Sequence, residues 1–162
     1  MDSIDRIKAQ WAKQRPDLDV EPMALIGRFQ RVSKALTREM EATFARHGLN
    51  GPSFDVLATL LRSGAPHALS PNELLETMMI TSGTLTNRID QLEKSGFVTR
   101  AGNKQDKRSV IVSLTEKGFA VIDAAVTAHV ETQTLLTSGL TAAEHKSLGQ
   151  LLQRFMLTLP GD

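Results

Sequence analysis

The sequence contains no cysteine, and this absence excludes several classes of protein. Without thiols the chain cannot form a disulfide framework, a zinc site with cysteine ligands or a thiol redox switch. Long apolar runs are also missing, because no stretch reaches the roughly 18 apolar residues that a membrane-spanning helix needs. Residues 1–11 are charged and amphipathic, unlike a secretory signal. We therefore expect a cytoplasmic protein.

Aromatic residues are scarce, at 4% of the sequence, whereas charged residues make up 23%. This composition suits a helical fold filled by leucine, alanine and methionine better than a sandwich with an aromatic core. A length of 162 residues corresponds to one domain, or to one domain with terminal extensions. We expect a single, mainly α-helical domain over residues 1–162.

Motifs for catalysis and metal binding are missing as well. No glycine-rich phosphate loop, nucleophile elbow or HExxH sequence occurs. The histidines are far apart in the sequence and lack the spacing of metal ligands; they are His47, His67, His129 and His145. We expect no enzyme, no metal sensor and no cofactor.

The net charge of +1 does not point to nucleic acid, but the distribution of charge does. Residues 81–108 hold six basic and three acidic side chains, so this segment is positive and the remainder of the chain is negative. A local basic stripe on a nearly neutral protein is typical of a binding site. On charge alone, an ordinary solvated loop is an equally good interpretation. The choice between a binding site and such a loop depends on the neighbouring motifs.

Residues 70–114 carry the most informative pattern in the chain. Two short stretches with helical spacing are followed by Gly96 and by two β-type runs that flank a charged loop. The apolar positions of the two helices are Leu74, Leu75 and Met78, then Leu85, Ile89 and Leu92. Spacings of three and four place each set on one face, which packs inward. The order helix, turn, helix, hairpin predicts a winged helix, with its second helix shaped for a DNA major groove.

The polar face of that second helix carries groups that read base edges or hold phosphates. Ser82 and Thr84 lie in the first turn, where free backbone amides also face phosphate. The candidates for base contacts are Thr86, Asn87, Arg88 and Gln91. Asparagine and glutamine suit adenine, and arginine suits guanine. Alternatively, some of these side chains cap the helix or pair with Asp90 or Glu93.

The charged loop predicts the second half of a DNA interface. Arg108 is planar and always charged, so it can enter a narrow minor groove, and Asp106 can hold the hairpin in shape by accepting hydrogen bonds from an arginine. Lys104, Lys107 and Arg100 are then phosphate contacts that add affinity without sequence preference. A winged helix that binds protein instead of DNA is the alternative, and it would tolerate the loss of these basic residues.

Amphipathic helices flank the predicted winged helix. They span residues 3–14, with Ser3 as the cap, and 21–46, then begin at residues 50–53, at Thr115 and at the capping box Thr141–Glu144. Both ends of the chain carry apolar side chains that a lone monomer would expose: Ile4, Ile7, Trp11, Leu151, Leu152, Phe155 and Leu159. We expect a homodimer in which residues 1–47 and 116–162 pair and each 51–115 lobe presents one reading helix to a pseudo-palindromic site. The alternative is that these helices pack only on their own domain.

With these elements in place, the chain resembles the MarR family of transcriptional regulators over nearly its full length. Residues 106–118 are similar to the family's wing signature, in which Asp-x-Arg is followed by a strand and by Leu-Thr-x-x-Gly. Residues 82–98 resemble its recognition helix and the turn into the wing. The resemblance implies a homodimeric repressor, less often an activator, with a ligand cleft between the dimerisation and DNA-binding lobes.

The first part of the chain is similar to one branch, which includes urate-responsive and PecS-type regulators. The matching residues are Trp11, residues 15–19, Met23, residues 27–28 and residues 54–57. That branch responds to urate, xanthine-like or phenolic anions through a tryptophan, an aspartate and nearby arginines. The resemblance therefore implies Trp11, Asp55 and Arg62 as effector residues here.

The residues alone leave two of these roles open. Trp11 is either a packing anchor in a dimer interface or a flat surface on which an aromatic ligand stacks. Asp55, between Phe54 and Val56, is either a partly buried carboxylate whose raised pKa answers to a ligand's charge, or a surface carboxylate favoured by the start of its helix.

Overall fold

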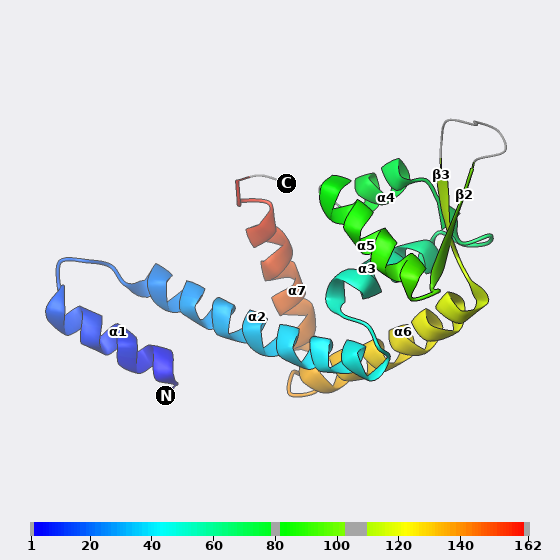
Figure 1. Cartoon of the computed structure of the whole chain (residues 1–162). Helices are drawn as coiled ribbons and strands as arrows, with labels where there is room; N and C mark the ends of the chain where they lie inside the picture. The colour runs from blue at the N-terminus through cyan, green and yellow to red at the C-terminus, as the bar shows by residue number, and fades with distance from the viewer. Residues whose placement is uncertain (1, 79–81, 103–109, 161–162) are drawn as a thin grey trace. The chain divides into compact units, whose positions relative to one another are not determined.

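The computed structural model describes residues 2–78, 82–102 and 110–160 (Figure 1). The chain divides into two compact units, one up to Ala42 and one from Thr43 onward. The expectation of a mainly α-helical chain with a small β wing is confirmed, because long helices account for most of the described residues and the strands form one small sheet.

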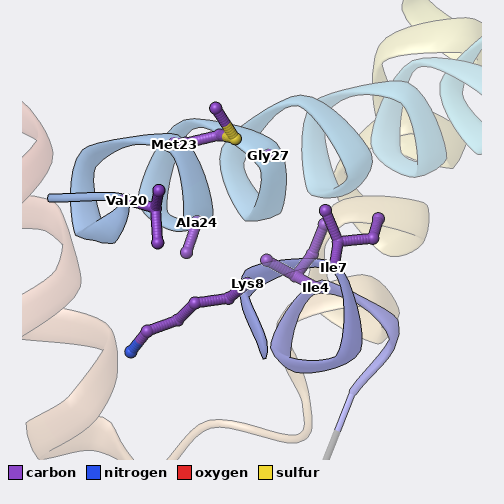
Figure 2. A pocket seen from close by; sticks show the side chains of 7 residues that line it. All are labelled: Ile4, Ile7, Lys8, Val20, Met23, Ala24 and Gly27. Carbon is purple, nitrogen blue, oxygen red and sulfur yellow. The ribbon is translucent and has the colours of Figure 1, made fainter. Parts of the chain in front are cut away.

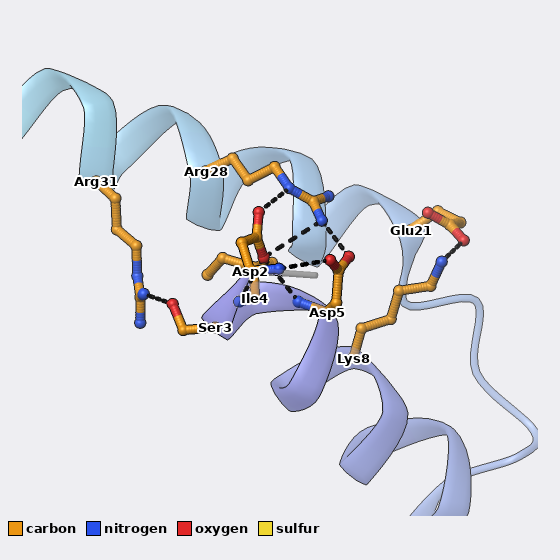
Figure 3. Close-up of polar contacts among 8 residues, drawn as sticks. All are labelled: Asp2, Ser3, Ile4, Asp5, Lys8, Glu21, Arg28 and Arg31. Carbon is orange, nitrogen blue, oxygen red and sulfur yellow. Dashed lines mark hydrogen bonds and ion pairs between the residues drawn. The ribbon is translucent and has the colours of Figure 1, made fainter.

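The first unit consists of α1 (Ser3–Gln14) and the larger part of α2 (Glu21–Arg46). We predicted Ser3 as the cap of α1, and this was wrong. Asp2 caps the helix instead, because its carboxylate accepts hydrogen bonds from the amides of Ile4 (2.7 Å) and Asp5 (2.9 Å), and the Asp5 carboxylate accepts one from the Asp2 amide (Figure 3). A carboxylate at this position also matches the positive end of the helix dipole.

Ionic contacts tie α1 to α2 within the first unit (Figure 3). The Arg28 guanidinium donates to Asp2 over 2.8 Å and also pairs with Asp5, and Lys8 pairs with Glu21. The hydrogen bond from Arg28 holds the pKa of Asp2 at about 2. These pairs are exposed to solvent, so they orient α1 more than they stabilise it.

The second unit contains the remaining elements of Figure 1. They are α3 (Gly51–Arg62), β1 (Ala68–Leu69), α4 (Pro71–Met78), α5 (Ser82–Lys94), β2 (Val98–Gly102), β3 (Val110–Leu114), α6 (Glu116–Thr137) and α7 (Ala142–Met156). Helix α3 contacts α4, α5, β3 and α6, and its residues Val56, Leu57 and Leu60 are fully buried. Each such side chain contributes roughly 1.5–3 kcal/mol when it leaves water, so α3 is the central support of this unit.

The three strands form an antiparallel sheet in the order β1-β3-β2. In the longer pair, Val98 lies opposite Leu114 and Gly102 lies opposite Val110, which forms the predicted hairpin. Strand β1, whose Ala68 and Leu69 pair with Ser113 and Val112, was not predicted from the sequence. A strand of two residues has no periodicity to detect, so only the fold reveals it.

Helix ends follow the predicted local signals. Asn50 caps α3 and Thr115 caps α6, and Thr141 and Glu144 form the predicted capping box of α7. The chain leaves α2 at Gly48, whose φ of 69° lies in the left-handed region that favours glycine at this position. These boundaries depend on side chains within a few residues of each helix end, which is why the sequence predicts them well.

Each unit leaves large apolar side chains exposed. In the first unit they include Leu25, Phe29 and Val32, which share one face of α2 by their spacing. In the second unit most of them lie on α6, on α7 and beyond it, and they include Val130, Leu135, Leu148, Leu151, Met156, Leu157 and Leu159. Ile4, which we expected to be exposed, is instead buried within the first unit close to Gly27.

Candidate nucleic-acid interface and effector residues

Helix α5 is held against the second unit's core by Leu85, Ile89 and Leu92, each no more than 2% exposed. The predicted inward face is therefore confirmed. Figure 1 shows α5 beside α4 and next to the β2–β3 hairpin, the arrangement expected of a helix-turn-helix with a wing. The structure thus presents the other face of α5 to solvent.

The predicted base-reading side chains lie on that outward side. Thr84, Thr86, Asn87 and Gln91 are exposed, and Arg88 is half-buried. Ser82 begins the helix, but its side chain lies outside the described part of the chain. The structure therefore shows where α5 begins, whereas the role of the Ser82 hydroxyl stays a prediction.

Lys94 also belongs to this face, although it is not among the DNA contacts predicted from the sequence. It is exposed and follows Asn87 by seven residues and Gln91 by three, so the three side chains share one side of the helix. An ammonium group in line with two amides suits a phosphate at the edge of a groove. The i, i+4, i+7 spacing of Asn87, Gln91 and Lys94 is visible in the sequence, and it predicts that Lys94 lies on the same side of the helix.

The wing is described only at its base. Strands β2 and β3 fix where the hairpin leaves the sheet, since Gly102 and Val110 are the last described pair. Four predicted DNA contacts lie outside the described residues: Lys104, Asp106, Lys107 and Arg108. Their positions in the sequence place them in the connection between two strands that the structure does pair.

Arg100 lies on β2 and has a different environment from the one the sequence suggested. Its guanidinium forms an ion pair with Asp90 and lies 3.6 Å from a Glu93 carboxylate oxygen, both on α5. Pairing with these two carboxylates was the alternative we stated for residues of the reading helix. Arg100 would have to leave these two carboxylates before it could bind a DNA phosphate.

The three predicted effector residues do not all lie in one unit. Trp11 is in the first unit, on α1, and 42% of its surface is exposed. Asp55 and Arg62 are in the second unit, both on α3 and two turns apart. The structure therefore brings Asp55 and Arg62 to one helix face, and Trp11 belongs to a separate part of the chain.

Asp55 is exposed, so of its two interpretations the partly buried carboxylate was wrong and the surface carboxylate agrees with the structure. Its neighbours Phe54 and Val56 point into the core, which turns Asp55 outward. Thr59 connects it with Arg62, because the Thr59 hydroxyl donates to the Asp55 carbonyl (2.7 Å) and accepts from the Arg62 guanidinium (3.2 Å). An acid and a base with a buried threonine between them form a polar strip along α3.

A small apolar pocket occurs in the first unit (Figure 2). It has a volume of about 150 Å³ and lies between α1 and α2, lined by Ile4, Ile7, Lys8, Val20, Met23, Ala24 and Gly27. None of the three predicted effector residues belongs to this lining. Its single cationic side chain, Lys8, is already paired with Glu21. The pocket therefore does not contain the effector residues that the family resemblance implies.

His129 on α6 is a half-buried residue, and in the sequence it stands out only as one of four scattered histidines. Its ring packs on Phe44 and Phe54, with ring centroids 5.0 and 4.9 Å away. Its Nδ1 atom is buried and has no hydrogen-bond partner within the described structure. Burial lowers the pKa of His129, and the negative charge of Asp55 partly opposes that shift.

This environment predicts acid sensitivity. A histidine whose pKa is lowered in the folded state binds a proton more readily in the unfolded chain. Protonation therefore lowers the free energy of unfolding. This loss is absent well above pH 6.5 and grows as the pH falls below that value. We expect the urea midpoint to fall between pH 7.5 and 5.5, and to fall less in His129→Phe, which keeps a ring against Phe44 and Phe54. Equal losses in both proteins, at one protein concentration, would remove His129 as a cause.

Two classes of site find no support in the described residues. No group of three or more histidine, cysteine, aspartate or glutamate side chains is placed to hold a metal ion in residues 2–78, 82–102 and 110–160. Across the same ranges, the helices lack an apolar stretch that could cross a membrane.

Comparisons with known proteins agree with this geometry. The MarR family model matches residues 49–110. The transcriptional regulator PecS of Dickeya dadantii is 42% identical over 151 residues, covering 93% of this chain and 91% of that protein. The transcriptional repressor YetL of Bacillus subtilis is 30% identical over 147 residues, covering 88% and 87%.

Among solved structures, a mutant MarR from E. coli complexed with operator DNA matches with a TM-score of 0.72 and 27% identity. The match covers 84% of this chain and 96% of that one. Winged-helix geometry, an outward polar face on α5 and similarity across almost the whole length lead to one assignment: this chain belongs to the MarR family of transcriptional regulators, in its PecS-like branch.

Proposed function

We propose that this protein is a ligand-responsive repressor that binds a pseudo-palindromic operator as a homodimer. The observation that carries the proposal is the placement of α5. Its apolar face is buried, and its outward face carries Thr84, Thr86, Asn87 and Gln91 in exposed positions. Hydroxyl and amide groups on an exposed helix of a winged helix-turn-helix are suited to base edges in a major groove.

The wing adds the second contact in this proposal. Lys104 and Lys107 bind phosphates, Arg108 enters the minor groove and Asp106 holds the hairpin. On α5, Ser82 and the first-turn amides bind phosphate, and Arg88 contacts a base or a phosphate from its half-buried position. The rival function, a winged helix that binds only protein, has no use for this set of cations.

Dimer formation is supported by the apolar surface that each unit leaves uncovered. Leu151 and Leu159 near the C-terminus, and Ile7 and Trp11 on α1, are all more than a third exposed. Large apolar side chains that each unit leaves exposed favour burial against another chain. Two-fold pairing would give one operator two α5 helices about one helical turn of DNA apart.

A gel shift tests this function. The protein should retain duplex DNA flanking its own gene at low salt and lose it as salt rises, because phosphate contacts release counterions. Sedimentation should show a dimer at the same protein concentration. A strictly monomeric species, or one that ignores duplex DNA at low ionic strength, would contradict the proposal.

The effector in this proposal is a small aromatic or anionic molecule, such as a urate-like or phenolic anion. Arg62 supplies a cation, Asp55 accepts a hydrogen bond and Trp11 offers an exposed ring face. A ligand that binds better to a dimer with wrongly spaced α5 helices shifts the population away from DNA.

Trp11→Phe separates stacking from packing. If Trp11 stacks on the effector, the concentration that releases DNA should rise, but by less than roughly 10-fold, because phenylalanine keeps a smaller ring and loses only part of the about 0.5–1.5 kcal/mol of an aromatic pair. Affinity for DNA without effector should stay near the wild-type value. The measurement is a gel shift titrated with a panel of urate-like and phenolic anions. The same release curve in both proteins would leave Trp11 with a packing role only.

A further inference from the structure

A cluster of one cation and two anions joins the base of the wing to α5. Arg100 of β2 pairs with Asp90, and its other terminal nitrogen lies 3.6 Å from Glu93. The Arg100 backbone amide donates to Glu93 Oε1 over 3.2 Å. One residue of the wing therefore contacts α5 through both its side chain and its backbone.

The cluster uses one flank of α5. Thr86, whose carbonyl oxygen is 3.5 Å from the Arg100 guanidinium, is followed by Asp90 and Glu93 at four and seven residues. This spacing aligns all three beside the outward face that carries Asn87 and Gln91. The cluster thus borders the proposed DNA-reading surface without occupying its centre.

The backbone contact has a further consequence because β2 is an edge strand. An edge strand leaves amides without a neighbouring strand on one side. Glu93 accepts one such amide, from Arg100, with a carboxylate. A charge-assisted hydrogen bond of this type fixes the start of the wing relative to α5.

Charge sets how the cluster meets DNA. Arg100 is paired with two carboxylates, so the three side chains together are negative by one unit. Moving the guanidinium to a phosphate would leave Asp90 and Glu93 uncompensated beside a polyanion. The two carboxylates and the nearby phosphates would then repel each other, so Arg100 is favoured to stay paired with Asp90 and Glu93.

We propose that Asp90 and Glu93 withhold Arg100 from the DNA backbone and, through it, fix the base of the wing against α5, so that the cluster raises discrimination between operator and other DNA. This assigns Arg100 a positioning role in place of the phosphate contact that the sequence suggested. The inference rests on the proposed function, since it needs α5 to face DNA.

The test compares three proteins on an operator duplex and on a non-operator duplex, over a series of salt concentrations. They are the wild type, the double variant Asp90→Asn/Glu93→Gln, and the triple variant that adds Arg100→Gln. The double variant frees Arg100 with little change in side-chain size. The triple variant is its matched control, because it lacks the carboxylate charges and the cation alike.

We expect the double variant to bind non-operator DNA on the order of tenfold more tightly at 0.1 M salt, with a salt dependence steeper by about 0.9 per protomer. The triple variant should return to the wild-type salt dependence. The ratio of operator to non-operator affinity should fall in the double variant. A triple variant with a shallower salt dependence than the wild type would show that Arg100 already contacts phosphate. An unchanged salt dependence in the double variant would show that the two carboxylates do not withhold Arg100, and either result would overturn the proposal.

A measurement without DNA tests the positioning itself. The Arg100 amide should exchange its hydrogen slowly in the wild type, faster in Glu93→Ala, and at nearly the wild-type rate in Glu93→Gln, whose side-chain oxygen still accepts. Equal exchange in all three would refute the contact. If the wild type retains no duplex while the exchange pattern holds, the proposed function fails and the cluster loses its DNA role, but the structural contact stands.

Discussion

Replacing Gly118 by alanine is expected to lower the free energy of unfolding by about 3 kcal/mol or more, because the new methyl group has no space. A Cβ atom at this position would lie 1.9 Å from the backbone oxygen of Phe97 and 2.8 Å from its carbonyl carbon. Backbone atoms cannot rotate away as the end of a side chain can. The start of α6 or the turn after α5 must therefore move.

The expected sign is informative, since two effects oppose each other. Helix propensity alone would make glycine to alanine stabilising by up to about 1 kcal/mol. The overlap with Phe97 is the larger effect, so we expect a melting temperature lower by roughly 6–12 °C. Thermal and urea unfolding at a fixed protein concentration measure both quantities.

Gly149→Ala is the matched control. Gly149 also lies inside a helix, α7, and among the described residues a Cβ there would meet no atom within 4 Å apart from its chain neighbours and the backbone of its own helix. This variant should be neutral or slightly more stable than the wild type. If Gly118→Ala proves as stable as Gly149→Ala, the close approach between α6 and Phe97 is not a constraint in solution.

This contact gives a physical reason for part of the wing signature. Thr115 Oγ1 accepts from the Gly118 amide (2.9 Å) and donates to the Gly96 carbonyl (2.7 Å), while its backbone amide donates to Phe97 (3.0 Å). Threonine followed three residues later by glycine thus locks the start of α6 onto the turn that ends α5. The motif can be found in the sequence, and the structure shows that it connects the start of α6 to the turn after α5.

Local signals explain what could be predicted. The inward face of α5, the capping box of α7 and the cap of α6 at Thr115 all depend on residues within two helical turns of one another. The order of elements then limits the fold to a winged helix, because few arrangements bury those faces together. This is why the helix boundaries and the β2–β3 hairpin agree with expectation.

Contacts between distant residues explain what could not be predicted. The outward turn of Asp55 depends on how its neighbours pack in the core. The pairing of Arg100 joins residues up to ten positions apart and across two element types. The isolated Nδ1 of His129 depends on Phe44 and Phe54, far away in the sequence. The residues alone left two interpretations of Asp55 open, and no periodicity or short motif encodes the contacts of Arg100 and His129.

The second large effect concerns DNA. Replacing Arg108 by alanine is expected to weaken operator binding by roughly 5- to 150-fold, which corresponds to about 1–3 kcal/mol for one specific arginine contact. Because both protomers of the proposed dimer carry the change, the loss approaches the upper end of that range. The salt dependence should become shallower by about 0.9 for each wing that loses its contact. Gel shifts at several fixed salt concentrations measure both.

The control for charge is Arg38→Ala. Arg38 lies on α2 with its side chain 77% exposed, and it pairs only with the adjacent Glu39 among the described residues. It removes the same charge from the chain at a position outside the second unit. Equal losses of affinity in the two variants would mean that total charge, and not the wing, determines binding.

Arg108→Lys distinguishes groove insertion from simple charge. Lysine keeps the cation, so the salt dependence should stay near that of the wild type, but its strongly hydrated ammonium enters a narrow minor groove less readily than a guanidinium. Affinity should then fall on an operator whose wing-facing pairs are A·T. Exchanging those pairs for G·C should weaken the wild type and leave the lysine variant nearly unaffected, because only the arginine benefits from a narrow groove. If both proteins respond equally to the exchange, Arg108 acts as a phosphate contact and sequence is read by α5 alone.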